Sequence, residues 1–308
     1  MRIFTGNAHP KLAQDICRYL GVDIGRAEIS HFPDSETKVR ILDDVRGAEA
    51  FVIQPTCTPV NEHLMELLVI IDALRRASAT RITAVIPYYG YARQDRKHEG
   101  RVPITAKLVA NLLTVAGAHR ILCMDLHAQQ IQGFFDIPLD HLYAAPVIID
   151  YLRRKGFDRP VVMSPDVGSM KMAHAFAKRL NGDLAVVEKR RLADDAIETG
   201  FVIGEVDGRD AIIVDDMIAS GGSMAGAVRV TREKGARSVT VVATHGLFVG
   251  PAFERLAAAS PDEIIVTDTV PTPPPPPRLR LTVLSVAGLL GEAINRIHKN
   301  KSVSLLFI

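Results

Sequence analysis

The sequence predicts an α/β protein in which parallel sheets are covered by helices. Short apolar runs of strand length alternate with helical patterns along the chain, an alternation typical of parallel strands joined by helices. The runs at residues 121–124, 161–163, 212–214 and 239–243 each end in a polar or Gly-rich segment. Because ligands of open α/β sheets bind at the carboxyl ends of the strands, we expect the chemistry there.

Length and composition indicate two globular domains. A chain of 308 residues is longer than a typical single core requires, and 47% hydrophobic with 23% charged residues is ordinary for a soluble protein. We place the boundary near residues 143–146, before a helical pattern at residues 147–155. The formal net charge of +2 gives no reason to expect a nucleic acid as partner.

The expected location is the cytoplasm. Cys17, Cys57 and Cys123 are far apart and form neither a disulfide framework nor a zinc spacing, which favours a reducing compartment. The first residues enter a strand-like run without the apolar core of a signal peptide. Since no apolar stretch approaches the length of a membrane span, we expect no membrane partner.

Three segments share one local plan. In each, a helical pattern is followed by a turn of small residues, and an arginine then directly precedes a buried strand. The three arginines are Arg81, Arg120 and Arg237. We interpret these segments as repeated αβ units.

A turn at residues 32–36 carries an aromatic side chain and two acids. Phe32 is suited to stacking on a base, and Asp34 and Glu36 to contacting a ribose. A β-turn with solvated acids explains the same residues equally well, so the turn by itself does not decide between the two interpretations.

A basic segment follows the strand predicted at residues 82–87. Aromatic and basic side chains interleave from Tyr88 to Lys97, a pattern that can stack single-stranded nucleic acid. One short stretch in a nearly neutral chain is a weak nucleic-acid footprint. A mobile basic loop that closes on a polyphosphate accounts for the pattern better.

Polar residues after two other strands are candidate metal ligands. His127 follows residues 121–124, and Asp166 follows residues 161–163. A single histidine in such a place is more often structural, but the two strand ends together indicate a divalent-metal site. Farther along, Lys189 and Arg191 alternate after a strand-like run and would point into one cleft, although a charged run is usually a solvated face.

The most informative segment is an apolar run that ends in Asp215 and Asp216. Residues 219–223 then form a small, Gly-containing turn before a helix that starts near Met224. Such a turn presents backbone N–H groups to a phosphate, with support from the helix dipole. Carboxylates accept hydrogen bonds from sugar hydroxyls. The segment therefore predicts a sugar-phosphate site, with an ordinary βα turn as the alternative.

Prolines dominate residues 271–277. They exclude a helix or a central strand and predict a stiff, polyproline-like surface loop.

Taken together, these segments resemble the ribose-phosphate pyrophosphokinase (phosphoribosyl-diphosphate synthetase) family along nearly the whole chain. Each motif alone is weak, but their order and spacing are specific. The motifs lie at residues 32–36, 64–68, 91–95, 106–111, 124–128, 130–136, 189–191 and 214–216.

The resemblance implies an α/β fold of two phosphoribosyltransferase-type (type I) domains, each a mainly parallel sheet flanked by helices. Residues 1–144 with about 295–308 would form the ATP-side domain, and residues 145–294 the ribose 5-phosphate domain. The implied reaction is a Mg²⁺-dependent transfer of diphosphate from ATP to the anomeric hydroxyl of ribose 5-phosphate. It would give AMP and 5-phosphoribosyl 1-diphosphate for nucleotide, histidine and tryptophan synthesis.

The resemblance also implies residue roles. ATP would contact Phe32, Asp34, Ser35, Glu36, Arg93 and Gln94, and Mg²⁺ would contact His127 and Asp166. Lys189 and Arg191 would be catalytic by stabilising the transferring group. Ribose 5-phosphate would contact Arg191, Asp215, Asp216, Ala219, Ser220, Gly221, Gly222 and Ser223. A homo-oligomer, a hexamer by resemblance, would bind phosphate and ADP as effectors at Arg46, Ser78, Ser302 and Ser304.

Two departures from the family pattern matter. Ala219 stands where the family usually has another acid, and Asp44 stands where we expect a serine. Since a carboxylate repels phosphate, we expect phosphate activation to be weak or absent and ADP to compete mainly with ATP. If Asp44 instead turns outward and pairs with a nearby arginine, the effector site would work.

Two rival functions remain open from the sequence. A phosphoribosyltransferase shares the paired acids and the phosphate turn but consumes the activated ribose. A non-catalytic, synthetase-associated subunit would be a binding protein on the same scaffold, and Ala219 is its only support.

Overall fold

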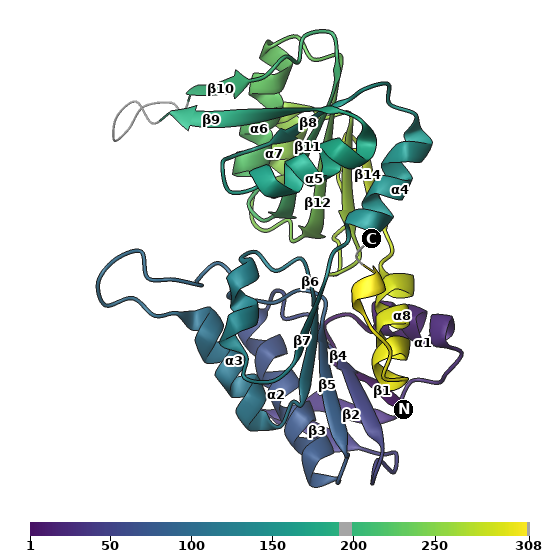
Figure 1. The fold of residues 1–308 in the computed structure, drawn as a ribbon. Coiled ribbons are helices and arrows are strands. Elements are labelled where there is room, and N and C mark those ends of the chain that lie inside the picture. Colours follow the sequence, from purple (N-terminus) through teal and green to yellow (C-terminus); the bar gives the residue numbers. More distant parts are fainter. Residues whose placement is uncertain (191–198, 307–308) are drawn as a thin grey trace. The chain divides into compact units, whose positions relative to one another are not determined.

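The computed structural model describes residues 1–190 and 199–306, and the chain divides into two compact units. The first unit comprises residues 1–143, 269–271 and 286–308, and the second comprises residues 144–268 and 272–285. Figure 1 shows their helices and strands.

The first unit is built on a five-stranded parallel sheet. In spatial order, the strands are β1 (Arg2–Thr5), β4 (Glu49–Ile53), β5 (Arg81–Ile86), β6 (Arg120–Met124) and β7 (Leu139–Leu142). Most of their residues are buried whichever way they point, as expected of a sheet covered on both faces.

Helices cover both faces of this sheet (Figure 1). On one face, α2 (Val60–Arg76) and α3 (Thr105–Ala116) supply apolar side chains such as Leu67 and Leu113 to a core that includes Val52 and Ala84. On the other face lie α1 (Pro10–Leu20) and α8 (Ala287–His298).

The return of the chain to the first unit begins earlier than the sequence suggested. Residues from 286 onward belong to it, whereas the sequence indicated about 295. The reason is that α8 packs against α1 and buries one apolar side, including Leu290 and Ile294. The hydroxyl of Tyr19 on α1 donates to Glu292 of α8 at 3.4 Å.

Smaller elements complete the first unit. An antiparallel hairpin of β2 (Ala27–His31) and β3 (Thr37–Ile41) packs on α2. Two short 3₁₀ helices are η1 (Gln129–Phe134) and η2 (Ser304–Leu306).

The second unit is built on a seven-stranded sheet, in which only the β9–β10 pair is antiparallel among the described residues. Its order is β10 (Thr199–Ile203), β9 (Asp183–Arg190), β8 (Val161–Ser164), β11 (Asp210–Ile218), β12 (Ser238–Gly246), β13 (Glu263–Thr267) and β14 (Leu281–Leu284). One face carries α6 (Gly222–Glu233) and α7 (Ala252–Ala259), and the other carries α4 (Ala145–Lys155) and α5 (Met170–Leu180).

Strand β11 runs past the end predicted from its apolar residues. Pairing with β12 continues at Asp215 opposite Ala243 and at Met217 opposite His245. The two acids therefore lie within the strand rather than after it. The following helix α6 starts at Gly222, slightly before the predicted start near Met224.

The repeated arginines are explained by ion pairs between the amino ends of neighbouring strands. Arg81 donates through Nε to Glu49 at 2.7 Å, Arg120 pairs with Asp140 at 2.5 Å, and Arg237 pairs with Asp210 at 2.5 Å. These contacts link β4 with β5, β6 with β7, and β11 with β12.

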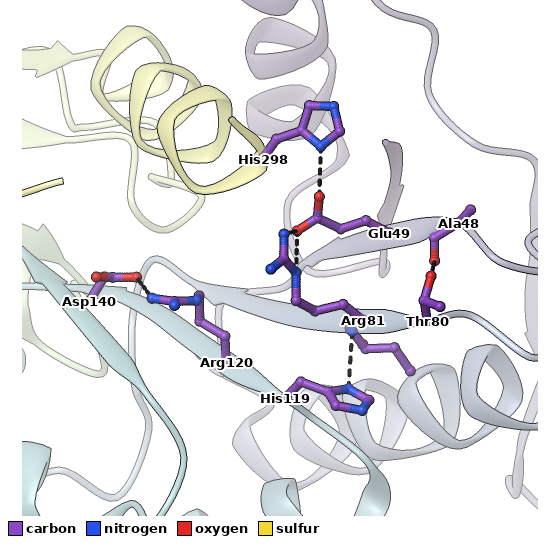
Figure 2. A network of polar contacts seen from close by, with 9 residues as sticks. Ala48, Glu49, Thr80, Arg81, His119, Arg120, Asp140 and His298 are labelled. Carbon is purple, nitrogen blue, oxygen red and sulfur yellow. Dashed lines mark hydrogen bonds and ion pairs between the residues drawn. The ribbon is translucent and has the colours of Figure 1, made fainter. Parts of the chain in front are cut away.

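Glu49 also holds the end of α8. Figure 2 shows its carboxylate between the guanidinium of Arg81 and the ring of His298; His298 Nδ1 lies 2.6 Å from Glu49 Oε2. One carboxylate thus ties two strands to the returning helix.

No helix or strand is assigned within the proline-rich residues 271–277. Over the part of the chain that the structure covers, none of the helices is long and apolar enough to cross a membrane.

The buried Glu263 generates a stability prediction. Its carboxylate accepts from Tyr151 at 2.8 Å and from Thr282 at 2.6 Å, and it pairs with Lys155. Burial alone would raise its pKa, but these donors together hold the pKa below the usual value. Losing Lys155 removes a hydrogen bond to a charged group, so Lys155→Met should lower the free energy of unfolding by about 1.5–3 kcal/mol.

Denaturant unfolding at neutral pH measures this loss. Arg154→Met is the matched control, because Arg154 pairs with Asp150 on the surface with both side chains 70% exposed, and such pairs contribute about 1 kcal/mol at most. Lys155 stabilises the fold only when Glu263 is ionised. The loss of unfolding free energy in Lys155→Met should therefore be full above the pKa of Glu263 in the unfolded state, and it should shrink as the pH falls through the pKa of Glu263 in the folded state. Equal losses in both variants would contradict the prediction.

Candidate functional site

The turn after β11 has the geometry of an anion site. It joins the strand directly to α6, whose N-cap is Gly221 without a side-chain cap. The first N–H groups of a helix have no acceptor within the helix, and its positive end favours an anion. Residues 219–223, predicted to bind a sugar phosphate, are thus brought together in one turn.

Gly221 is required at this turn by both its conformation and its surroundings. Its φ is +74°, and a Cβ at this position would lie 3.0 Å from the carbonyl oxygen of Ala252. The neighbouring Gly222 has room, since its Cβ would meet Arg255 only at 3.6 Å. Arg255 Nη1 also donates to the carbonyl of Ser220 at 3.1 Å, which fixes the turn against α7.

Beside the turn, the carboxyl group of Asp215 has a raised pKa. Burial raises its pKa to about 7, and the negative charge of Asp216 adds to the effect. Ser169 donates to the Asp215 carboxylate and partly offsets the shift. Hydroxyl donors from a ligand, or a cation, would favour the ionised form.

Asp166, a predicted metal ligand, belongs to the same group of acids. Its Oδ1 accepts from the N–H groups of Gly168 at 2.9 Å and Ser169 at 3.2 Å, and its charge also raises the pKa of Asp215. A divalent cation would relieve this mutual repulsion of carboxylates, so the residues fit Mg²⁺.

The described residues contain no group of three or more His, Cys, Asp and Glu side chains that could hold a metal by themselves. A Mg²⁺ ion at Asp166 would therefore draw most of its ligands from water and substrate phosphates, as Mg²⁺ commonly does.

In the first unit, the other predicted metal ligand follows the carboxyl end of β6. His127 is exposed there, and the two residues before it are anchored to β7. The N–H of Asp125 donates to the carbonyl of Leu142 at 3.0 Å, and that of Leu126 donates to His141 Nε2 at 2.9 Å.

Arg93 and Gln94, predicted to contact ATP, are exposed in the segment after β5. The segment is held where Gly90 donates its N–H to Thr56 Oγ1 at 2.7 Å. A Cβ at Gly90 would lie 2.5 Å from the carbonyl oxygen of Thr56, so a larger residue would push the segment away. The hydroxyl of Tyr91 donates to Asn61 on α2.

The predicted nucleotide turn joins β2 to β3. Phe32 donates its N–H to the carbonyl of Glu36 at 2.8 Å, Asp34 accepts from the N–H of Glu36 at 3.3 Å, and Ser35 has a φ of 72°. The Phe32 side chain is 45% exposed, with Lys38 Nζ 5.4 Å from the ring centroid. The ring is thus partly exposed in a hydrogen-bonded turn, with one cation near it, an arrangement compatible with the predicted stacking on a base.

The two predicted catalytic cations are only partly described. Lys189 lies in β9, opposite Gly200 of β10. Arg191 lies outside the described residues.

The predicted effector residues form two pairs in the first unit. Arg46 Nη1 donates to Ser78 Oγ at 3.3 Å, and the hydroxyls of Ser302 and Ser304 lie 2.6 Å apart. Both of the latter serines line a cavity of about 670 Å³ together with Arg120 and Lys301. The sequence did not indicate that Arg120 lies beside these serines, because no local pattern links the start of β6 to the C-terminal segment.

Two family descriptions match the chain. Residues 1–117 match the N-terminal domain of ribose phosphate pyrophosphokinase, and residues 196–308 match the phosphoribosyl synthetase-associated domain. A ribose-phosphate pyrophosphokinase from Nostoc sp. is 54% identical over 100% of this chain and 93% of its own length. The chain belongs to the ribose-phosphate pyrophosphokinase family.

Other members agree over their full length. The ribose-phosphate pyrophosphokinase of Rhodopirellula baltica is 54% identical over 100% of this chain and 98% of its own length. The crystal structure of phosphoribosylpyrophosphate synthetase from Mycobacterium smegmatis is 44% identical, with a TM-score of 0.91 over 97% of this chain and 99% of that one. The family and the fold class predicted from the sequence are confirmed.

The coupling between the paired acids can be tested directly. Because the charge of Asp216 raises the pKa of Asp215, Asp216→Asn should move the pKa of Asp215 down from about 7 toward the ordinary aspartate value. Carbon-13 NMR of the aspartate carboxyl groups during a pH titration measures both values. A wild-type Asp215 that titrates with the other aspartates would contradict the prediction.

Proposed function

We propose that this chain transfers the diphosphoryl group of ATP to the anomeric hydroxyl of ribose 5-phosphate, giving 5-phosphoribosyl 1-diphosphate and AMP. The observation that carries the proposal is the sequence of features along β11 and α6. Asp215 and Asp216 are followed directly by the Gly221 turn and the helix N-terminus. Membership of the pyrophosphokinase family over the whole chain supports the same reaction.

The turn at residues 219–223 binds the phosphate of the sugar phosphate, and the two acids before it bind the ribose. The 5-phosphate accepts hydrogen bonds from backbone N–H groups at the start of α6, where the helix dipole favours an anion. Asp215 and Asp216 accept hydrogen bonds from the ribose hydroxyls, which favour the ionised form of Asp215. Ala219 leaves this turn without the further acid that the family usually has there.

The remaining proposed residues act on the nucleotide and on the charge of the transferring group. Phe32 stacks on the base, and Asp34, Ser35, Glu36, Arg93 and Gln94 contact the rest of ATP. Asp166 and His127 would hold Mg²⁺, which neutralises charge on the phosphates when bound.

The oxygen of the anomeric hydroxyl attacks the β-phosphorus and gives up its proton. The bond from this phosphorus to the oxygen that bridges the α- and β-phosphates breaks, and AMP leaves with that oxygen. Lys189 and Arg191 stabilise the transferring group. No side chain needs to act as a covalent nucleophile.

Release of AMP from ATP tests the function. AMP should appear only when ribose 5-phosphate and Mg²⁺ are both present, together with 5-phosphoribosyl 1-diphosphate. A phosphoribosyltransferase would instead consume 5-phosphoribosyl 1-diphosphate with a base, and a non-catalytic subunit would release no AMP. Either result would overturn the proposal.

The Gly221 turn generates a matched pair of variants. Gly221→Ala places a Cβ in a left-handed conformation and 3.0 Å from the carbonyl of Ala252, whereas Gly222→Ala has room. We expect Gly221→Ala to raise the KM for ribose 5-phosphate about tenfold, since such strain costs roughly 1–2 kcal/mol. Gly222→Ala should change the KM by about twofold or less. Steady-state kinetics measures both, and equal effects would show that the turn does not form the phosphate site.

We also infer that the active form is a homo-oligomer and that the effector residues Arg46, Ser78, Ser302 and Ser304 bind phosphate weakly or not at all, so that ADP acts mainly by competing with ATP. Asp44 is exposed, and its carboxylate accepts the backbone N–H of Arg46 at 3.0 Å. This hydrogen bond keeps the negative charge of Asp44 beside the backbone of Arg46, the residue whose guanidinium would bind the anion, and the charge disfavours phosphate.

Measuring the rate against phosphate at fixed ionic strength tests this effect. We expect weak or no activation of the wild type and activation of Asp44→Ser, because the substitution removes the charge. Strong activation of the wild type by millimolar phosphate would show that Asp44 does not impair the site.

A further inference from the structure

We propose that Thr105 is a positioning residue for ATP: its hydroxyl fixes the side-chain amide of Gln94 with the NH₂ group directed to the nucleotide. The proposal rests on the proposed role of Gln94 in ATP binding. The structural basis is one hydrogen bond, from Thr105 Oγ1 to Gln94 Oε1, between residues at the two ends of the basic loop 95–104.

The backbone of Gln94 is already fixed on both sides. Its N–H donates to the carbonyl of Tyr91 at 3.0 Å, and its carbonyl accepts from the N–H of Ala106 at 3.1 Å. These two hydrogen bonds do not fix the side-chain torsions of Gln94, and its side chain lies at the surface. The bond from Thr105 is the contact that restrains them.

Thr105 is itself rigidly placed, because it is the first residue of α3. The next two residues anchor the start of this helix. The carbonyl of Ala106 accepts from the buried Tyr89 hydroxyl at 2.9 Å, and Lys107 Nζ donates to the carbonyl of Phe134 at 2.6 Å. The Thr105 hydroxyl is therefore placed by helix α3 and not by the loop at residues 95–104.

The helix does not use the Thr105 hydroxyl as a cap. A threonine at a helix start usually caps it when it is the N-cap residue, but here the N-cap is Ile104, which makes no side-chain cap hydrogen bond. The Thr105 hydroxyl donates instead to a side chain that lies before the loop. A purely local role in starting α3 does not explain this contact.

The chemical consequence is a fixed polarity of the Gln94 amide. A glutamine side chain offers one acceptor oxygen and an NH₂ group with two donors. With Oε1 engaged by Thr105, the NH₂ group is the end left for a ligand. Phosphate oxygens and the ring nitrogens of a base accept hydrogen bonds, so they match this end and are repelled by the other.

The nearest acid does not compete for the amide. Asp95 follows Gln94, and its Oδ2 accepts from Gln130 Nε2 at 2.5 Å. Its carboxylate is therefore held toward η1.

Two substitutions at Thr105 separate the hydroxyl from the shape of the side chain. Thr105→Val keeps the branched shape and removes the donor, and Thr105→Ser keeps the donor. We expect Thr105→Val to raise the KM for ATP about three- to tenfold, the effect of one neutral hydrogen bond. The kcat and the KM for ribose 5-phosphate should stay within about twofold, and Thr105→Ser should behave like the wild type.

Thr114→Val is the matched control on the same helix. The Thr114 hydroxyl donates to the carbonyl of Ala110 at 2.9 Å, a contact within α3, so its loss should leave the KM for ATP unchanged. Thermal unfolding of all variants shows whether the helix start is intact. If Thr105→Val and Thr114→Val raise the KM for ATP equally, the effect is structural and the proposal fails.

A double-mutant cycle with Gln94→Ala distinguishes this proposal from the proposed function. Gln94→Ala should raise the KM for ATP, and adding Thr105→Val to it should have no further effect, because the hydroxyl acts through Gln94. If Gln94→Ala leaves the KM unchanged, its proposed ATP role fails and the positioning role fails with it. If Gln94→Ala raises the KM for ATP but Thr105→Val does not, only the positioning role is overturned. The same holds if Thr105→Val raises the KM for ATP as much in the Gln94→Ala variant as in the wild type.

Discussion

The placement of charged residues in both sheets depends on the parallel pairing of their strands. In the five-stranded sheet all amino ends lie at one edge and all carboxyl ends at the other, and in the seven-stranded sheet this holds for every strand except β10, which is antiparallel to β9. At the amino edge, the pairs Arg81–Glu49 and Arg237–Asp210 hold neighbouring strands together. At the carboxyl edge lie candidate site residues, as Asp215 near the end of β11 and His127 after β6 illustrate. The ion pairs between strands and the candidate site residues therefore lie at opposite edges.

The segments at the carboxyl edge are held by their backbones rather than by their functional side chains. A Cβ at Gly90 would lie 2.5 Å from the carbonyl oxygen of Thr56, and one at Gly221 would lie 3.0 Å from that of Ala252, so both backbones lie close to their neighbours. Close backbone contact of this kind fixes a loop while leaving side chains such as Arg93 exposed. Gln94 is an exception, because Thr105 also fixes its amide. Rigid placement before the ligand arrives reduces the ordering cost of binding.

Two acids of the second unit show how the surroundings of a carboxylate set the direction of its pKa shift. Both are removed from water. Glu263 is surrounded by donors from Tyr151, Thr282 and Lys155, which hold its pKa below the usual value. Asp215 lies beside Asp216 with few donors of its own, and burial with this like charge raises its pKa to about 7. Three side-chain donors thus outweigh burial at Glu263, whereas burial and the like charge of Asp216 outweigh the hydrogen bond from Ser169 at Asp215.

The sequence by itself determined the alternation of strands and helices, the turn at residues 32–36 and the small, Gly-containing turn at residues 219–223, because periodicity and turn chemistry are local. Only the tertiary structure decided what joins distant segments. In the tertiary structure α8 packs against α1, and Arg81 pairs with Glu49. Strand β11 is extended by its pairing with β12, and Thr105 donates a hydrogen bond to Gln94. These contacts depend on how the chain packs, and no spacing along the sequence encodes them.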